Sequence, residues 1–289
     1  MPETPRRVAF AGLGIMGAPM AAQLVRAGFE VRAYTRTREK AERFAAEHGA
    51  TAASTPADAA EGADAFVSIV PDAPQVEQVL FGENGAAAAL PEGAIVVEMS
   101  TISPTASKAV AQRLAPRPYV EAPVSGSKPK AEDGTLTIMA GGEPDAFEQA
   151  RPLFDAMGEV IVHVGPVGHA QMAKLLTNAM GAVNAAMLAG AIRTAKAAGI
   201  DADAFLEVAA NSAGASAMVN LKGRPMFEER FQPPLFKLEH MLKDVRHCLA
   251  EAKALGIELD LSALAEGYYA RADENGHGED DFAAVYTAL

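Results

Sequence analysis

Near its start the chain carries the stretch VAFAGLGIMGAPMAAQ, which runs from Val8 to Gln23. A short apolar run, typical of a buried strand, meets a glycine-rich turn, and the pattern of a helix follows at once. Glycines 12, 14 and 17 have the spacing GxGxxG. In this arrangement the first glycine permits a tight turn, the second lets a pyrophosphate approach the backbone, and the third lets the helix pack on the strand. The stretch therefore predicts a strand, a turn and a helix whose N-terminus holds the phosphates of a dinucleotide.

The same alternation of strand and helix continues along the chain. Further strands are predicted at 29–34, 65–70, 95–99, 119–120, 136–140 and 160–164. Further helices are predicted at 39–49 and 104–114, and the second of these begins with Ser103 as its N-cap and Pro104 at its first helical position. Strands that alternate with helices predict an α/β fold with a doubly wound, mostly parallel sheet.

After Gly165 only helical patterns remain. They cover a long acid-free segment and the ranges 203–211, 238–255 and 262–275. A chain of 289 residues fits about two domains. We therefore predict a dinucleotide-binding domain over 1–164 and an all-helical domain over 165–289.

Composition excludes several classes of protein. The net charge of −12 argues against nucleic-acid binding, and the single cysteine, Cys248, allows no disulfide within the chain. Residues 175–192 carry no charge, but their alanine and glycine content and the polar Thr177, Asn178 and Asn184 argue against a membrane span. The histidines lack metal-ligand spacing. We expect a cytoplasmic protein without a signal peptide, a metal site or a membrane anchor.

The residues after the second strand indicate which dinucleotide binds. NAD-binding units place an acidic residue there, whereas this chain has Thr35, Arg36, Thr37 and Arg38 before the first acid, Glu39. A guanidinium can hold a 2′-phosphate, which a carboxylate would repel. We predict NADP(H), with Arg36 as the main contact and the two threonines as hydroxyl donors. The predicted cofactor contacts on this part of the chain are Gly12, Leu13, Gly14, Ile15, Met16, Gly17, Thr35, Arg36, Thr37, Val70 and Pro71.

Three later segments concentrate groups that can handle a small anion. They are VEMSTI at 97–102, EAPVSGSKPKAEDG at 121–134 and GPVGHAQMAKLLTN at 165–178. The second reads as a loop rich in glycine, hydroxyls and lysine, which can offer backbone N–H groups to an anion. The third opens the long helix, where Lys174 and Asn178 lie four residues apart on one face.

Together with GLGIMGAPM and the pair Lys243-Asp244, these segments resemble the β-hydroxyacid dehydrogenases. That family includes 3-hydroxyisobutyrate dehydrogenase, tartronate semialdehyde reductase and glyoxylate/succinic semialdehyde reductase. The resemblance covers essentially the whole chain and is strongest to the last branch. It implies a Rossmann domain followed by an all-α domain, joined by a long central helix.

The resemblance also implies roles for particular residues. By it, Lys174 is catalytic, and Ser125 and Gly126 hold the substrate carboxylate with Thr101 near both substrate and cofactor. It implies further that Asn178 orients the substrate. Lys243 would lie at the cofactor and substrate cleft, where Phe236 would close the pocket.

Elementary chemistry agrees with a catalytic lysine. Aldehyde reduction needs a hydride at carbon and a proton at oxygen, and an ammonium can stabilise the developing alkoxide and deliver that proton. No carboxylate follows Lys174 along its helix. We predict an NADPH-dependent reductase of a small aldehyde-acid of the glyoxylate or succinic semialdehyde type, assembled as a homodimer or homotetramer.

Several alternatives remain open. Within the same class of enzyme, the alternative is a 3-hydroxyisobutyrate dehydrogenase or a tartronate semialdehyde reductase. Imine reductases share the architecture but usually lack a lysine at position 174, and non-enzymatic chromatin-associated relatives have lost it. The 6-phosphogluconate dehydrogenases carry a longer C-terminal domain than 289 residues allow. Among the remaining groups, we expect Cys248 to pack in the core and the cluster Glu279, Asp280 and Asp281 to form a solvated turn that caps the C-terminal helix.

Overall fold

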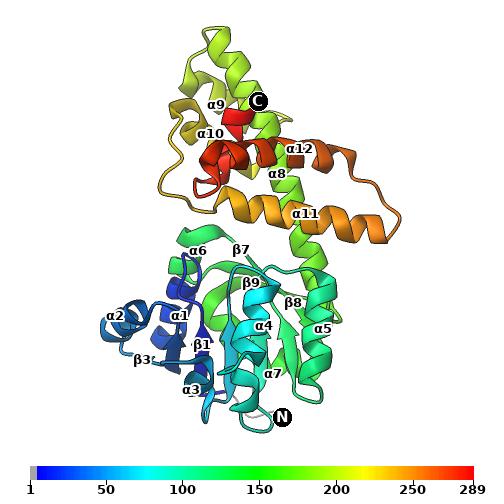
Figure 1. Ribbon diagram of the computed structural model, residues 1–289. Coiled ribbons are helices and arrows are strands. Elements are labelled where there is room, and N and C mark those ends of the chain that lie inside the picture. The colour runs from blue at the N-terminus through cyan, green and yellow to red at the C-terminus, as the bar shows by residue number, and fades with distance from the viewer. Residues whose placement is uncertain (1–4) are drawn as a thin grey trace. The chain divides into compact units, whose positions relative to one another are not determined.

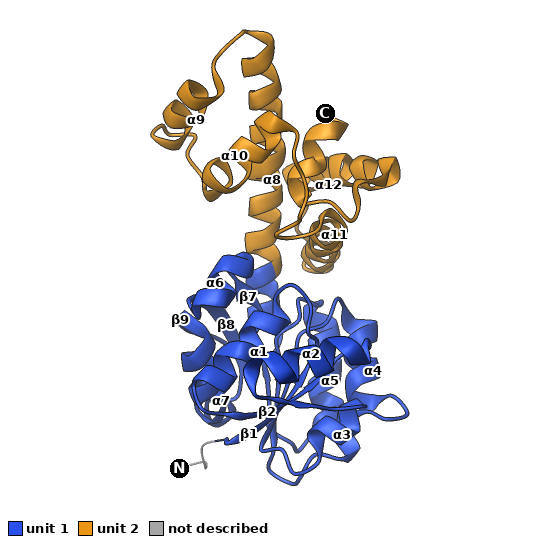
Figure 2. Ribbon diagram, turned by 90° about the vertical axis from the view of Figure 1, so that its left-hand side faces the viewer, with its two compact units in different colours: residues 1–174 blue, residues 175–289 orange. Residues whose placement is uncertain are grey.

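The computed structural model describes residues 5–289. The chain divides into two compact units, Met1–Lys174 and Leu175–Leu289 (Figure 2). This division falls inside the long helix α8 (His169–Ala197). The predicted domain boundary, between 164 and 165, precedes that helix and stays a prediction.

The first unit is built on a nine-stranded sheet in the order β3-β2-β1-β4-β5-β6-β8-β7, with β9 paired to β8. The strands are β1 (Arg7–Ala11), β2 (Glu30–Tyr34), β3 (Thr51–Ala52), β4 (Ala65–Ser68), β5 (Ile95–Glu98), β6 (Tyr119–Glu121), β7 (Val124–Ser125), β8 (Leu136–Gly142) and β9 (Gly158–Gly165). Strands β1 to β6 pair in parallel, and β8 runs antiparallel to β6 and β7. The predicted α/β fold with a mostly parallel sheet is confirmed.

Helices cover both faces of this sheet (Figure 1). They are α1 (Gly17–Arg26), α2 (Arg38–His48), α3 (Pro56–Ala60), α4 (Ala73–Phe81), η1 (Ala86–Ala88), α5 (Pro104–Leu114), α6 (Ser127–Asp133) and α7 (Pro144–Met157). Side chains alternate along a strand, so Val8 and Phe10 of β1 join one core with α1, α2, α6 and α7. Ala9 and Ala11 join a second core with α3, α4 and α5. Both faces are therefore buried, as a doubly wound sheet requires.

Local signals explain where several helices begin. The side chain of Ser103 accepts a hydrogen bond from Ala106 N, and Pro104 follows it, which confirms the predicted start of α5. Thr55 before Pro56 and Asp72 before α4 use the same combination of cap and proline. Neither of these two helices was predicted, although the signals are present in the sequence.

The segment 121–134 is more ordered than a loop. The prediction was wrong there, because β7 and α6 occupy most of the segment. Gly126, with a φ of 138°, makes the turn between them, and Gly134 ends α6 in the left-handed region. The content of glycine, hydroxyls and lysine had suggested a loop, but Val124 pairs antiparallel with Ile138 of β8, which lies 14 residues further along the chain.

The second unit contains helices and no strand between Leu175 and Leu289, all of which the structure describes. Besides α8, its helices are α9 (Ala202–Ala210), α10 (Ala217–Glu228), α11 (Leu238–Ala254), α12 (Asp260–Ala272), η2 (Asp273–His277) and η3 (Phe282–Ala288). They enclose a core around the fully buried Tyr269, whose hydroxyl donates to Ala182 O at 3.3 Å. The predicted all-helical C-terminal region is confirmed. Cys248 is buried and unbonded to sulfur, as expected for a packing residue.

Helix α8 is long and apolar enough to cross a membrane by length and composition alone, a test that core helices of soluble proteins also pass. Ala182, Ala185 and Ala189 on one side are fully buried. On the other side Met180 is 65% exposed and Met187 is 71% exposed. In the single chain the helix is therefore buried on one side and exposed on the other.

The acidic cluster near the C-terminus is only partly solvated. Asp281 is buried, and both its carboxylate oxygens lie 2.8 Å from Lys222 Nζ. It also accepts a hydrogen bond from Ala283 N, so it caps η3 as predicted. The prediction of a solvated turn was wrong for Asp281, because this residue is buried in an ion pair with Lys222. The sequence near the cluster could not indicate this pair, since Lys222 lies 59 positions away. Burial lowers the pKa of Lys222, and the charge of Asp281 opposes that change.

Candidate active site

The glycine turn between β1 and α1 has the geometry of a pyrophosphate cradle. Gly12 has a φ of 109°, and a Cβ on it would lie 2.1 Å from Ile69 O. A Cβ on Gly17 would lie 1.8 Å from Gly12 O, whereas a Cβ on Gly14 would meet nothing within 4 Å. The first and third glycines thus allow close backbone packing, and the second leaves open space for a ligand.

The start of α1 suits an anion. Its N-cap residue, Met16, makes no side-chain cap, and the first turn holds no acidic residue. Ala18 N donates to Gly14 O at 3.2 Å and Pro19 has no N–H, so what this turn offers a phosphate is the backbone N–H of Gly17 and the positive end of the helix dipole. In the same turn Leu13 is buried and Ile15 is 37% exposed. The sheet order reverses between β1 and β4, which is where open α/β sheets bind their ligands.

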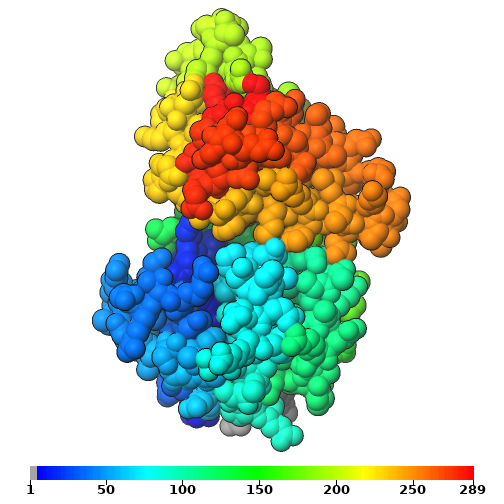
Figure 3. Space-filling model, in the orientation of Figure 1, coloured from blue at the N-terminus to red at the C-terminus, as the bar shows by residue number. Residues whose placement is uncertain are grey.

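The residues after β2 lie beside this turn. Gly12 N donates to Tyr34 O at 2.9 Å, so the glycine turn and the end of β2 are joined directly. Thr35 is half-buried, and the segment 36–40 is exposed at the surface of its unit (Figure 3). Arg38 is occupied by an ion pair with Glu42 at 2.7 Å, while Arg36 forms no ion pair within the described residues 5–289. Arg36 is thus the guanidinium that is better placed to receive a phosphate.

The turns after β4 and β5 are bound to one another. Val70 N donates to Ser100 Oγ at 2.8 Å, and Ser100 N donates to Glu98 Oε1 at 2.7 Å. Ser68 Oγ donates to the other oxygen of Glu98. Pro71 follows Val70 directly, and Thr101 follows Ser100. The structure therefore gathers the predicted cofactor residues of unit 1 along the carboxyl ends of β1, β2, β4 and β5.

Glu98 is a buried carboxyl group beneath these turns. It is fully shielded from solvent, and this burial raises its pKa from a usual value of 4.5 to about 7, against the opposing hydrogen bonds from Ser100 and Ser68. Because its folded-state pKa is raised, protonation stabilises the folded protein. That contribution is complete below about pH 4.5 and is lost as the pH rises through about 7.

Replacing Glu98 with glutamine should remove this pH dependence. The amide oxygen can accept from Ser100 N, the amide NH₂ can donate to Ser68 Oγ, and the shape is unchanged. Between about pH 5 and pH 8, the wild-type free energy of unfolding should fall by up to about 3 kcal/mol relative to the variant. Urea unfolding at several pH values measures this difference. A difference that is constant with pH would show that Glu98 does not titrate in this range.

A second buried carboxyl group fixes the start of α8. Glu121, at the end of β6, accepts hydrogen bonds from Gly168 N at 2.8 Å, Ala170 N at 2.9 Å and Gln171 N at 3.2 Å. Its other oxygen accepts from Ser107 Oγ at 2.5 Å. Burial raises the pKa of Glu121, and these hydrogen bonds oppose the change. Glu121 therefore caps α8 from another element and holds the first turn of the helix against the sheet.

Lys174 follows one turn later. Lys174 is only 8% exposed to solvent, which is unusual for a lysine. Asn178 lies four residues further along the same helix, which places both on one face. The sequence had predicted this pair, but it gave no sign that the turn before Lys174 is anchored by Glu121.

Ser125 and Gly126 lie at the end of β7. Ser125 is exposed and pairs with Thr137 of β8, and Gly126 follows in its positive-φ turn. A Cβ on Gly126 would lie 2.7 Å from Lys130 Cβ, so the turn admits no side chain at this position. The N-terminus of the short helix α6 comes directly after this turn.

In the second unit a buried aspartate joins two of the predicted residues. Asn178 Nδ2 donates to Asp244 Oδ2 at 2.7 Å. Lys243 Nζ lies 2.9 Å from Asp244 Oδ1, in an ion pair that lacks hydrogen-bond alignment. Asp244 is 1% exposed, so its carboxyl group lies inside the unit. The sequence analysis mentions Asp244 only as the neighbour of Lys243. Its contact with Asn178 could not be predicted, because the two residues lie 66 positions apart.

Phe236 lies in the segment that leads into α11. Its ring centroid lies 6.1 Å from that of His240 and 6.0 Å from that of Phe282. Its N–H donates to Asp281 Oδ2 at 3.3 Å, so the buried ion pair of Asp281 also holds this segment. Burial lowers the pKa of His240, against the charge of Glu239.

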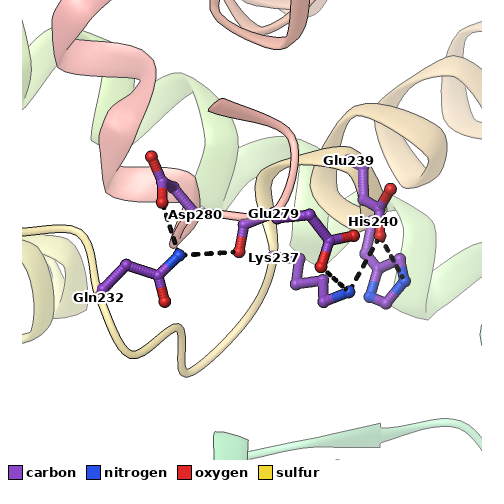
Figure 4. A network of polar contacts seen from close by, with 6 residues as sticks. All are labelled: Gln232, Lys237, Glu239, His240, Glu279 and Asp280. Atoms are coloured by element: carbon purple, nitrogen blue, oxygen red, sulfur yellow. Dashed lines mark hydrogen bonds and ion pairs between the residues drawn. The ribbon is translucent and has the colours of Figure 1, made fainter. Parts of the chain in front are cut away.

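A polar network joins Gln232 and Lys237, which lie on either side of Phe236 in the sequence, to Glu279 and Asp280 (Figure 4). On one side Gln232 Nε2 donates to Asp280 Oδ1 at 2.6 Å and to Glu279 O at 3.3 Å. On the other side Lys237 Nζ lies 2.6 Å from Glu279 Oε2 and 3.3 Å from Glu239 Oε1. Contacts within its own unit therefore join the segment around Phe236 to the residues that precede η3.

Comparison with known proteins identifies the class of enzyme. Residues 7–165 match the family described as the NAD binding domain of 6-phosphogluconate dehydrogenase. Residues 168–289 match the family described as the NAD-binding domain of NADP-dependent 3-hydroxyisobutyrate dehydrogenase. A solved structure of 3-hydroxyisobutyrate dehydrogenase (ygbJ) from Salmonella typhimurium is similar with a TM-score of 0.90 and 30% identity, over 98% of this chain and 99% of that one. The fold and the cradle define a nicotinamide-dinucleotide-dependent oxidoreductase.

Curated relatives narrow this class. The chain is 35% identical to 2-hydroxy-3-oxopropionate reductase of Escherichia coli (strain K12), over 98% of this chain and 97% of the relative. It is 34% identical to NAD-dependent L-serine dehydrogenase of Pseudomonas aeruginosa, over 97% and 96%. It is 33% identical to glyoxylate/succinic semialdehyde reductase 1 of Arabidopsis thaliana, over 98% of both chains. The chain belongs to the 3-hydroxyisobutyrate dehydrogenase-like β-hydroxyacid dehydrogenase family, as its motifs predicted.

Proposed function

We propose that this protein reduces a small aldehyde-acid to the hydroxyacid with NADPH, and that Lys174 is the proton donor. The observation that carries the proposal is the burial of Lys174 one turn beyond a helix start that Glu121 fixes to the sheet. Burial is unusual for a lysine, and a buried titratable group is a candidate for a functional role. Membership of a hydroxyacid dehydrogenase family makes proton transfer to a carbonyl oxygen the natural task.

In this proposal each residue of the candidate site has a separate role in the reaction. A bound nicotinamide supplies the hydride. Lys174 holds a proton near the substrate oxygen, stabilises the negative charge that develops there and transfers the proton to it. Asn178, which Asp244 orients, positions the same oxygen. Ser125, Gly126 and Thr101 bind the substrate carboxylate, while Phe236 and Lys243 of the second unit complete the binding residues.

We propose NADPH as the preferred cofactor because of the residues after β2. Arg36 is exposed and outside any ion pair within residues 5–289, and no carboxylate lies between Tyr34 and Glu39. A 2′-phosphate can form a bidentate, charge-assisted contact with such a guanidinium. NAD dependence is the alternative, since the Pseudomonas relative is named as NAD-dependent.

A panel of substrates tests the activity. We expect NADPH consumption with glyoxylate or succinic semialdehyde, faster than with NADH, and slower turnover of tartronate and methylmalonate semialdehydes. A preference for either of the last two would favour a tartronate or 3-hydroxyisobutyrate enzyme. Reduction of cyclic imines without reduction of any aldehyde-acid would contradict the proposal and would favour an imine reductase.

We further propose a cytoplasmic homo-oligomer, either a dimer or a tetramer. Leu176 and Met180 of α8 and Leu261 of α12 are exposed and line an apolar groove of about 440 Å³. Met187 extends this apolar surface along α8. Exposed apolar surface of this kind supports a contact with a second copy of the chain.

A further inference from the structure

The amide side chain of Gln171 makes two hydrogen bonds that bracket Thr101. Its Oε1 accepts from Ile102 N at 3.1 Å, and its Nε2 donates to Ser100 O at 2.9 Å. Gln171 is fully buried. The residue bonded on each side is thus the immediate neighbour of Thr101, so the amide fixes the backbone that presents the threonine side chain.

Gln171 also belongs to the first turn of α8, and its own backbone is fixed. Its N–H donates to Glu121 Oε1 at 3.2 Å. Lys174 follows three residues later, about 4.5 Å further along the helix axis. A single residue therefore links three elements of the first unit: the end of β6, the turn after β5 and the helix turn that carries Lys174.

We propose that Gln171 is a positioning residue that sets the distance between Thr101 and Lys174, an inference that rests on the proposed function. Catalysis by an oriented proton donor is sensitive to small displacements, because an error of about 1 Å can cost about 100-fold in rate. Loss of the two hydrogen bonds leaves a buried N–H and a buried C=O without partners, so the turn at Thr101 must move to find others. The distance between the proton donor, Lys174, and the substrate-binding turn at Thr101 is then no longer fixed.

Replacing Gln171 with methionine tests this role, because methionine keeps the length of the side chain and removes both hydrogen bonds. We expect kcat for succinic semialdehyde to fall by about 10- to 100-fold, while the Kd of NADPH, measured by fluorescence without substrate, stays within about two-fold. The matched control is Ile95→Ala, which creates a cavity in the core. Ile95 is fully buried and begins β5, at the opposite end of that strand from Ser100. It should lower the melting temperature comparably and leave kcat within about two-fold. Equal loss of kcat in both variants would overturn the proposal.

A second variant, Gln171→Glu, gives a pH readout that a purely structural role would not show. A protonated carboxyl group can accept from Ile102 N and donate to Ser100 O, whereas a carboxylate can only accept. The ratio of variant to wild-type kcat should therefore rise as the pH is lowered from about 8 to about 6. A ratio that does not change with pH, together with a wild-type kcat, would overturn the proposal.

Lys174→Ala separates this inference from the proposed function. If Lys174→Ala keeps wild-type turnover, the proposed function fails, and the positioning role fails with it. If Lys174→Ala is inactive and Gln171→Met retains wild-type kcat, only the positioning role is overturned.

Discussion

Replacing Lys174 with alanine is expected to lower kcat for aldehyde reduction by about 10²- to 10⁴-fold, the range that a positioned proton donor usually contributes. The Kd of NADPH should change by no more than about two-fold, because the predicted phosphate contacts lie in the glycine turn and after β2. Steady-state turnover and fluorescence titration of NADPH measure the two effects separately. A loss in kcat without a loss in cofactor binding identifies a group that acts in the transition state.

The control for this variant is Lys196→Ala. Lys196 lies on the same helix, α8, and forms a surface ion pair with Glu229 at 2.6 Å. Exposed pairs of this kind contribute little to stability, so the control should keep wild-type kcat and nearly the wild-type melting temperature. Turnover of the Lys174 variant at the level of the control would contradict the proposed mechanism.

Much of the fold could be predicted because short stretches of adjacent residues indicate where its strands and helices begin. The glycine turn after Val8–Ala11 predicted β1 and α1, and the cap at Ser103 predicted the start of α5. The switch to helical patterns after Gly165 predicted the helices of the C-terminal region. Each of these signals is confined to a few adjacent residues, so no knowledge of distant contacts was needed.

The errors occurred where distant contacts decide the structure. The segment 121–134 contains the strand β7 because Val124 pairs with Ile138 of β8. Asp281 is buried because Lys222 neutralises it from another helix. Residues that look like a loop or a solvated turn in sequence are ordered here by partners that no local pattern reveals.

The candidate site shows the same division. Motifs singled out Lys174, Asn178 and Lys243, but not the groups that hold them. Glu121 contacts the start of α8 across 49 positions, and Gln171 contacts Ser100 across 71. Both residues lie inside segments that the sequence analysis singled out, but their supporting roles are defined by hydrogen bonds between elements and not by spacing along the chain.

Replacing Arg36 with aspartate is expected to raise the Kd of NADPH by about 100-fold or more and to leave the Kd of NADH within about three-fold. The substitution removes a charge-assisted pair worth about 1.5–3 kcal/mol and adds repulsion between a carboxylate and the 2′-phosphate. An acidic residue at the end of the second strand can instead accept hydrogen bonds from the ribose hydroxyls of NADH. Fluorescence titrations with both cofactors at one ionic strength measure the change, since salt screens exposed charges.

Arg38→Ala provides the matched control, because Arg38 is the neighbouring guanidinium and is already paired with Glu42 at 2.7 Å. Its side chain is 76% exposed, so its removal should alter stability and NADPH binding only slightly. If Arg38→Ala weakened NADPH as strongly as Arg36→Asp, the phosphate contact would belong to Arg38. Equal weakening of NADPH and NADH by Arg36→Asp would mean that Arg36 does not distinguish the two cofactors, and the preference for NADPH would then have to arise elsewhere in the turn after β2.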